Sequence, residues 1–298
     1  MEANLLYNVS NGETFGYMIA VYFYLTGLSA GSFIISTLGY GFGVEKYRPL
    51  GKPGVILATL LLVAAPMFLL LHVGKPLRSW HLFMWINLTS PISWGSYLLT
   101  LYPINCIIYG YFMFTGRAKL TKIFGLVGIP LALFVHGYTG FILAFGKARP
   151  LWNSSIMPLL FLVSAMVSGI ALMILVAAVK DRFFSPERKV NKELVFDLAK
   201  ILGWMIVFDL FLVVCEEATH LVSHQGAIDA TTLLLTGKFV VPFLVIEIFV
   251  GKIIPLIVVM VPRFRTVPAV IAVSILAFVC ILAMRFNVVL GGEYIPLI

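Results

Sequence analysis

Charged side chains are scarce in this sequence, and their scarcity limits the class of protein. Only 11% of the 298 residues are charged, whereas soluble domains carry about 25%. Hydrophobic residues make up 61% of the chain, and the mean hydropathy is +1.03. The apolar runs are continuous, whereas the strands of a membrane barrel would alternate. We therefore expect an all-α polytopic membrane protein surrounded by membrane lipid, and no nucleic-acid partner despite the net charge of +8.

Cysteine is also rare. Cys106, Cys215 and Cys280 each lie inside a different apolar run. An iron–sulfur cluster needs about four closely placed thiolates, so we expect neither a cluster nor another metal site in this chain. The cysteines fit small buried hydrophobic residues. No lysine or arginine precedes Lys46. The first apolar run therefore lacks the cationic start of a signal peptide and is expected to stay as a membrane helix.

Eight apolar runs reach the length of about 20 residues that a helix needs to cross a bilayer. The expected spans are 15–39, 54–73, 94–114, 123–145, 156–179, 198–222, 239–261 and 267–289. Residues 1–298 are thus expected to form one integral membrane domain. The connection 180–193 mixes both signs of charge around a proline, which is typical of a hinge between two halves of a protein.

Lysine and arginine are distributed unevenly between the two sides of these spans. The odd-numbered connections are rich in them, for example Lys46, Arg48 and Lys52 in the first, whereas the even-numbered connections carry few. Because basic loops tend to stay in the cytoplasm, both termini are expected to face away from it. The even number of spans agrees with this topology. The outer side then holds the segments 72–94, 147–153, 220–238 and 291–298.

Two local patterns concern packing and docking. Gly27 and Gly31 form a small-xxx-small face, which lets membrane helices approach closely. The loop 72–94 is rich in tryptophan, histidine and basic residues. Interfacial tryptophans often serve only as anchors, but this combination favours an ordered platform for a partner or a lipid headgroup.

Ionisable residues inside the expected spans are costly, so a functional role is the default interpretation. The residues considered are Asp209, Glu216, Glu217, His220, Glu247 and Arg285. At about 100° per residue, Asp209, Glu216 and His220 share one stripe of the sixth span. Three interpretations remain open: Arg285 neutralises Glu216 or Glu217 in a buried pair, or the set forms a proton route to the outer face, or it binds a ligand.

The histidines test whether the chain is a cytochrome b. A haem chain across a bilayer needs axial histidines near both faces. By the expected topology every histidine lies in the outer half; these are His72, His81, His136, His220 and His224. We therefore expect no haem route across the membrane, while a single outer haem in a cytochrome b-type anchor remains an alternative.

The stretch 136–153, HGYTGFILAFGKARPLWN, suits a lipid-soluble redox ligand. It is an apolar helix that carries His136 and Tyr138 and ends in a cationic turn with Arg149 and Trp152. A phenol and an imidazole near one membrane face suit a mostly apolar ligand with a polar head, such as a quinone. An imidazole can also transfer a proton near neutral pH.

Several motifs follow one another along most of the chain: GLSAG, GKPLRSWHLF, SPISWGSY, GYTGF, ARPLWN and RFNVVLGGEYIPL. In these motifs and their order the chain resembles the polysulfide reductase membrane-subunit family, also called NrfD-like. The resemblance implies eight membrane helices in two four-helix bundles, residues 15–146 and 156–289. The quinone site would lie in the first bundle.

The resemblance also implies partners and a location. The chain would bind menaquinone or ubiquinone near the outer face, hold no haem or iron–sulfur cluster, and dock on a ferredoxin-like subunit with four iron–sulfur clusters. A molybdenum or tungsten subunit would act on the terminal substrate. The protein would lie in the prokaryotic cytoplasmic (inner) membrane, with its catalytic face toward the periplasm or the cell exterior.

The resemblance also suggests site residues. A tyrosine of the fourth span contacts the quinone in that family, and Tyr138 is the matching position. Family members commonly have a carboxylate where this chain has His72, which can also exchange a proton. The expected catalytic residues are Tyr138, His136 and His72. The expected quinone-binding set adds Lys75, Arg78, Arg149, Trp152, Asn153 and Glu13, with the cations stabilising negative charge on the ring oxygens. Asn11 and Tyr17, near Glu13, would complete the pocket.

Two functions of other classes fit parts of the sequence. A secondary transporter for a small anion would use the intramembrane acids, the arginines and the glycines of the helices, but no convincing internal repeat accompanies them. A structural anchor would tether a partner without binding a quinone.

Overall fold

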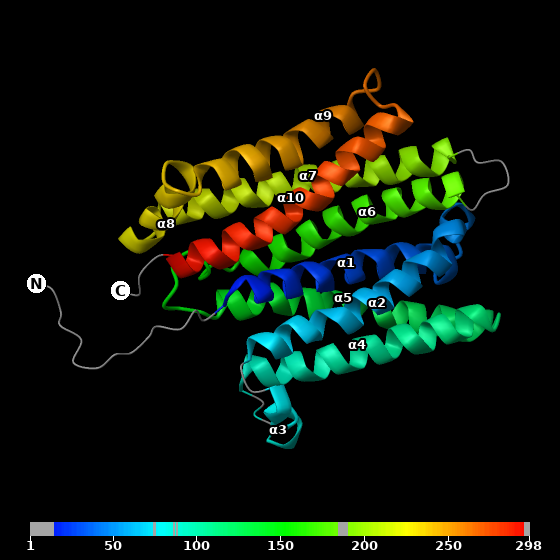
Figure 1. Ribbon diagram of the computed structural model, residues 1–298, viewed down its shortest axis with the longest axis horizontal. Helices are drawn as coiled ribbons and strands as arrows, with labels where there is room; N and C mark the ends of the chain where they lie inside the picture. The colour runs from blue at the N-terminus through cyan, green and yellow to red at the C-terminus, as the bar shows by residue number, and fades with distance from the viewer. Residues whose placement is uncertain (1–14, 74–75, 86, 88, 184–189, 295–298) are drawn as a thin grey trace, which may run out of the picture.

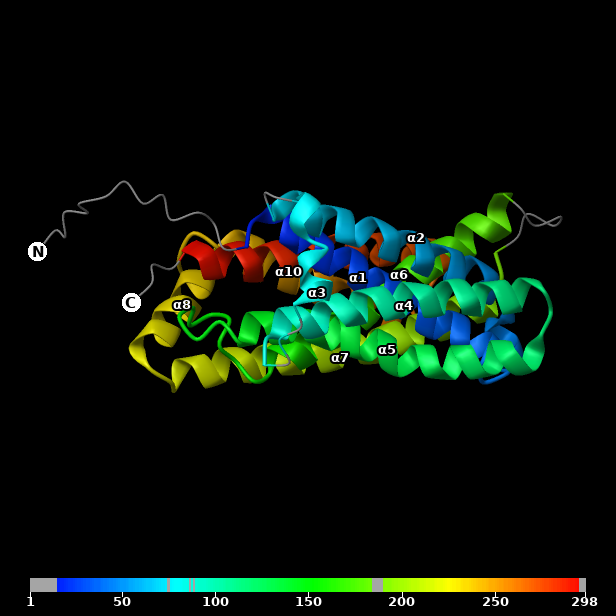
Figure 2. The same ribbon diagram turned by 90° about the horizontal axis from the view of Figure 1, so that it is seen from below.

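The computed structural model describes residues 15–73, 76–85, 87, 89–183 and 190–294, and regular secondary structure within these ranges is helical. The helices run roughly along one common axis in both views (Figures 1 and 2). Within the described ranges, eight helical segments are long and apolar enough to cross a membrane. This confirms the predicted all-α architecture and the predicted number of spans.

The first four spans are α1 (Tyr17–Tyr40), α2 (Arg48–His72), α4 (Pro91–Phe114) and α5 (Ala118–Ala144). The second four are α6 (Met157–Phe183), α7 (Lys192–Leu221), a composite seventh span and α10 (Val267–Tyr294). The seventh span is a π-helix, η3 (Val241–Ile253), that continues into α9 (Ile254–Met260). Short helices in the connections are η1 (Glu45–Tyr47), η2 (Pro76–Arg78), α3 (His81–Met84) and α8 (Gln225–Leu235).

The spans pack as two neighbouring groups. In the first group, α1 contacts α2 and α5, and α4 contacts α2 and α5. In the second group, α6, α7, α10 and the η3–α9 span contact one another, while α1 and α5 join the groups by packing on α6. The connection between α6 and α7 therefore joins neighbours within one group. It does not separate two halves, as the hinge prediction for 180–193 required, and residues 184–189 lie outside the described ranges.

Two glycines of α1 allow this helix to pack closely against α6 and α5. A Cβ placed on Gly31 would lie 2.7 Å from the Cα of Gly169, well inside van der Waals contact. A Cβ on Gly27 would lie 2.9 Å from Cε1 of His136. The predicted small-residue face of α1 is thus confirmed, and it brings α1 against α6 and α5.

The start of α1, the end of α10 and the short helix α8 lie at the same end of the molecule, which we call the α8 end (Figure 1). Here the connection between α5 and α6 is fastened to α10. Trp152 Nε1 donates to the carbonyl of Val288 at 2.7 Å, and Arg149 Nη2 donates to Glu293 Oε2 at 2.8 Å. Glu293 Oε1 accepts the backbone N–H of Phe15 at 2.9 Å. This terminal clamp therefore ties three parts of the chain together.

Candidate functional site

A cavity of about 200 Å³ lies among α1, α2, α4 and α5 toward the α8 end, with a contribution from α3. Most of its lining is apolar, including Ile19, Leu69, Leu99 and Ile142. Its polar side chains are Tyr22, His72, Ser96 and Tyr138. An enclosed apolar space with a few polar groups is the usual form of a small-molecule site.

Tyr138 reaches this cavity because α4 has no side chain at Gly95. A Cβ at position 95 would overlap both the ring and the hydroxyl oxygen of Tyr138. Tyr138 also lines a second hollow, of about 380 Å³, between α4 and α5, where its neighbours include the exposed side chains of Trp94 and Phe134. The tyrosine therefore borders both the inner cavity and a groove on the outer surface of the helices.

Two further polar groups reach the cavity from other helices. His72 is the last residue of α2, so the structure brings it together with Tyr138, as the expected site required. Tyr22 of α1 is 3% exposed, and its hydroxyl has no hydrogen-bond partner among the described residues. The sequence analysis did not select Tyr22. It selected Tyr17, whose side chain is 58% exposed.

His136 lies on the other face of α5. Two residues of an α-helix that are two positions apart are separated by about 200°, so His136 and Tyr138 point to nearly opposite sides. His136 is fully buried, with Nε2 2.7 Å from the carbonyl oxygen of Phe161 and 3.2 Å from Nη2 of Arg285. It is not among the residues that line the cavity. The expected pairing of His136 with Tyr138 is therefore wrong.

The other expected quinone ligands that the structure describes are not gathered at the cavity. Arg149 and Trp152 belong to the terminal clamp. Arg78 ends the short helix η2 and is exposed, and Asn153 is exposed in the connection between α5 and α6. Lys75 and Glu13, together with Asn11, lie outside the described residues.

A buried ion-pair cluster occupies the second group of helices. Lys252 Nζ lies 2.8 Å from Asp209 Oδ2 and 3.0 Å from Glu247 Oε1, and the side chains of all three are almost completely enclosed. Asn287 Nδ2 donates to Glu247 Oε2 at 2.8 Å. In an α-helix, residues five apart are about 140° out of line. The i→i+5 geometry of the π-helix η3 instead places Glu247 next to Lys252. The sequence analysis did not select Lys252, although it lies inside the expected seventh span.

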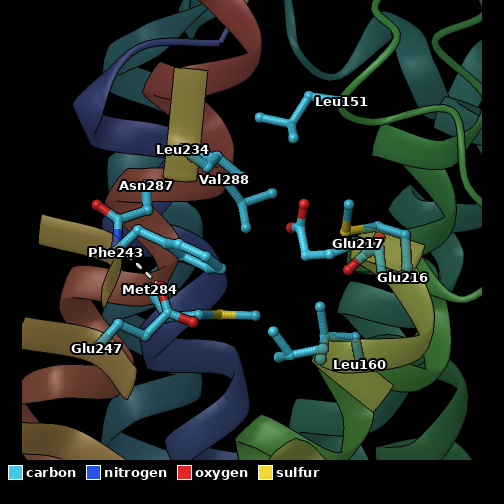
Figure 3. A pocket seen from close by; sticks show the side chains of 12 residues that line it. Leu151, Leu160, Glu216, Glu217, Leu234, Phe243, Glu247, Met284, Asn287 and Val288 are labelled. Atoms are coloured by element: carbon cyan, nitrogen blue, oxygen red, sulfur yellow. Dashed lines mark hydrogen bonds between the residues drawn. The ribbon is translucent and has the colours of Figure 1, made fainter. Parts of the chain in front are cut away.

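Glu216 and Glu217 of α7 face a second, smaller cavity. Figure 3 shows them on one side, with Phe243, Glu247 and Asn287 on the other. The cavity is about 20 Å³, which is enough for one water molecule. Glu217 Oε2 accepts the hydroxyl of Thr231 at 2.8 Å, whereas Glu216 Oε1 has no partner among the described residues.

Arg285 does not pair with a carboxylate in the described structure. It is fully buried, and its Nη2 lies 2.7 Å from Ser164 Oγ and 3.0 Å from the carbonyl oxygen of Phe161. Its guanidinium carbon is 3.8 Å from the centre of the Phe161 ring. The predicted ion pair between Arg285 and Glu216 or Glu217 is therefore wrong. His220 is also buried, with no partner for either ring nitrogen among the described residues.

These elements define a class of protein. Eight apolar spans enclose a small, mostly apolar cavity and a separate buried charge cluster, so this is a polytopic helical membrane protein. The described residues contain no group of three or more His, Cys, Asp or Glu side chains that could hold a metal ion. Residues 6–296 match the family described as polysulphide reductase, NrfD. The chain belongs to this family of membrane subunits.

Several relatives are named for redox complexes. The chain is 30% identical to the Hdr-like menaquinol oxidoreductase integral membrane subunit of Archaeoglobus fulgidus, over 98% of this chain and 74% of that protein. It is also 30% identical to a selenate reductase subunit of Mesobacillus selenatarsenatis, over 68% of this chain and 56% of that protein. Protein NrfD of Escherichia coli is 25% identical over 92% and 93% of the two chains. The homologues are thus membrane subunits of reductase or oxidoreductase complexes.

Proposed function

We propose that this chain is the quinone-binding membrane subunit of a respiratory oxidoreductase complex, and that the quinone ring occupies the cavity beside Tyr138 and His72. The cavity itself carries the proposal, because a phenol and an imidazole from different helices both line a mostly apolar space. An apolar wall suits the ring and its isoprenoid tail, and the polar groups suit the ring oxygens. The menaquinol oxidoreductase relative supports this ligand class.

The unpartnered hydroxyl of Tyr22 also fits a ring oxygen. A buried polar group without a hydrogen bond costs about 1–3 kcal/mol, and such groups are uncommon in folded proteins. Because Tyr22 and Tyr138 both line the cavity, their hydroxyls can hydrogen-bond a ligand that enters it.

A bound quinol supplies two electrons and two protons. In the proposed site, Tyr138 and Tyr22 orient the ring oxygens through hydrogen bonds. His72, at the end of α2, accepts the two protons one after the other at a ring nitrogen and releases each toward the α8 end, because imidazole exchanges protons near neutral pH. These roles place the proton chemistry at one end of the spans.

The electrons need a docked acceptor or donor. We propose a ferredoxin-like iron–sulfur subunit at the α8 end and, beyond it, a molybdenum or tungsten subunit. The name of the selenate reductase relative supports a terminal reductase as a partner. We place the complex in a prokaryotic cytoplasmic (inner) membrane, with both termini and the α8 end outside the cytoplasm, because the odd-numbered connections are basic.

We further propose a proton route through the second group of helices. Asp209 and Glu247 share Lys252, and Glu247 faces Glu216 and Glu217 across a cavity that can hold one water molecule. In the proposed route a proton moves along these carboxylates, from the middle of the second group of helices toward the α8 end. The proposed route does not include Arg285, because its described contacts are with Ser164 and the carbonyl of Phe161.

The variant Tyr138→Phe tests the quinone site in the assembled complex. It keeps the ring but removes the hydroxyl, so we expect intact assembly and a loss of quinone-linked turnover of about tenfold or more. Tyr111→Phe is the matched control, because Tyr111 lies near the opposite end of α4 and is 59% exposed. Rates in membranes are measured together with the set of polypeptides that co-purify with each variant. Full turnover in Tyr138→Phe would contradict the site.

A further inference from the structure

A large groove lies between α2 and α6 at the end of the molecule opposite the α8 end. Its volume is about 830 Å³, and it is lined by Pro53, Ile56 and Leu57 of α2 and by side chains between positions 172 and 180 of α6. Every lining side chain except Lys180 is apolar. The groove is therefore apolar along its length and has one cation, Lys180, at its end.

Lys180 donates a hydrogen bond to a carbonyl oxygen of α2 that lacks a donor within its own helix. Pro53 has no backbone N–H, so the carbonyl of Pro49, four residues earlier, has no donor from its own helix. Lys180 Nζ supplies one and lies 2.7 Å from that carbonyl oxygen. An ammonium group has three N–H donors, and among the described residues only the Pro49 carbonyl accepts one of them. The other two donors are therefore proposed to bind a ligand in the groove.

The length of the groove matches one leaflet of a membrane. Positions 172 and 180 are separated by about 12 Å along a helix that rises about 1.5 Å per residue. Half of the hydrocarbon core of a bilayer is about 15 Å thick. An acyl chain that lies along Leu172 and Val176 would thus bring its headgroup to the level of Lys180.

We propose that this groove binds one anionic phospholipid of the cytoplasmic leaflet, with an acyl chain between α2 and α6 and the phosphate on Lys180. Phosphate oxygens are strong acceptors for an ammonium group. Lys52 and Arg48 add positive charge at the same end of α2, and basic sites between helices on the cytoplasmic side favour anionic lipids. A phosphate supplies a counter-charge for Lys180, which an apolar helix of a partner would not.

Native mass spectrometry of the full chain in detergent tests this proposal, with phosphatidylglycerol and phosphatidylcholine as probes. We expect the wild type to retain phosphatidylglycerol preferentially. Lys180→Gln should weaken that binding roughly fivefold and leave phosphatidylcholine unchanged, while Lys180→Arg should restore it. The control is Lys200→Gln, an exposed lysine of α7 outside the groove. Leu175→Trp, which fills the groove, should remove the retained lipid.

Three outcomes would overturn the proposal. Equal retention of the two lipids by the wild type would mean that the groove holds only ordinary surrounding lipid. Equal effects of Lys180→Gln and Lys200→Gln would show that Lys180 does not bind a headgroup. Unchanged phosphatidylglycerol retention in Leu175→Trp would show that the lipid does not occupy this groove. None of these results depends on the quinone site.

Discussion

Tyr138 and Gly95 form the most specific residue pair of the proposed site. The ring of Tyr138 occupies the space that a side chain at position 95 would need, so a glycine on α4 fixes where the phenol of α5 can lie. The sequence analysis selected Tyr138 through a family resemblance but had no way to identify Gly95. The importance of Gly95 arises from contact between two helices, and no pattern within one helix reveals it.

Gly95→Ala is therefore expected to act through Tyr138. The added methyl group would displace the phenol, and small misplacements of a positioned group can cost on the order of 100-fold. We expect a loss of quinone-linked turnover of about 10- to 100-fold, with the complex still assembled. Gly110→Ala on the same helix is the control, since its Cβ would lie 3.5 Å from Val55, an ordinary contact. Equal activities of the two variants would show that Gly95 does not position the tyrosine for quinone chemistry.

The expectation that His136 and Tyr138 share one site failed because it did not take account of the angle between them on the helix. His136 and Tyr138 are two residues apart, and the angle of about 200° already argued against a shared cavity. The sequence alone could not select Tyr22, because a single tyrosine in an apolar helix does not indicate a ligand site. Only the structure shows that its hydroxyl lacks a hydrogen-bond partner among the described residues. His72 and Tyr138 share a cavity because the end of α2 and one face of α5 both border the space among α1, α2, α4 and α5.

At the scale of elements, the seventh span shows what the sequence analysis missed. It named Glu247 among the ionisable residues of the spans but left out Lys252 of the same span. The π-helical turns of η3 align the two residues, and such segments often occur at functional sites. Lys252 balances Asp209 and Glu247, whereas Arg285, one candidate partner of Glu216 or Glu217, contacts Ser164 and the carbonyl of Phe161 instead.

Lys252→Met should leave Asp209 and Glu247 without their cation. Breaking a buried ion pair by removing one partner typically costs about 3–5 kcal/mol. We expect a correspondingly lower free energy of unfolding in detergent, measured by thermal or denaturant unfolding. Adding Asp209→Asn and Glu247→Gln should recover most of the loss, because the orphaned charges are then removed. Lys200→Met, at an exposed position, should be nearly neutral. A Lys252→Met protein as stable as this control would rule out the cluster as a structural element.

The terminal clamp leads to a different expectation for Arg149, which the sequence analysis assigned to the quinone. Its guanidinium holds the end of α10 through Glu293, and both side chains are only 13% exposed. Arg149→Gln should lower the free energy of unfolding by about 1.5–3 kcal/mol, the usual range for a hydrogen bond to a charged group. The KM for quinol should stay at the wild-type value in steady-state assays of the complex. A large rise in KM with unchanged stability would show that Arg149 binds the quinone.

At the scale of the whole molecule, the sequence was most informative. Eight long apolar runs determine the number of spans, since each buries its own backbone hydrogen bonds in lipid, and the order of motifs identified the family. The grouping of the spans depends on contacts between helices, so the position of the hinge was misjudged. Among the described residues, no observation specifically supports the transporter alternative or the haem alternative.

The location of the quinone in the first group of helices is the claim on which the rest depends. Its most direct test is labelling of the assembled complex with a photoreactive azido-menaquinone, followed by mapping of the modified peptides. We expect competition by unlabelled quinone and modification of peptides that contain Tyr22, Gly95 or Tyr138. Labelling confined to α6–α10, or labelling that excess quinone does not reduce, would contradict it.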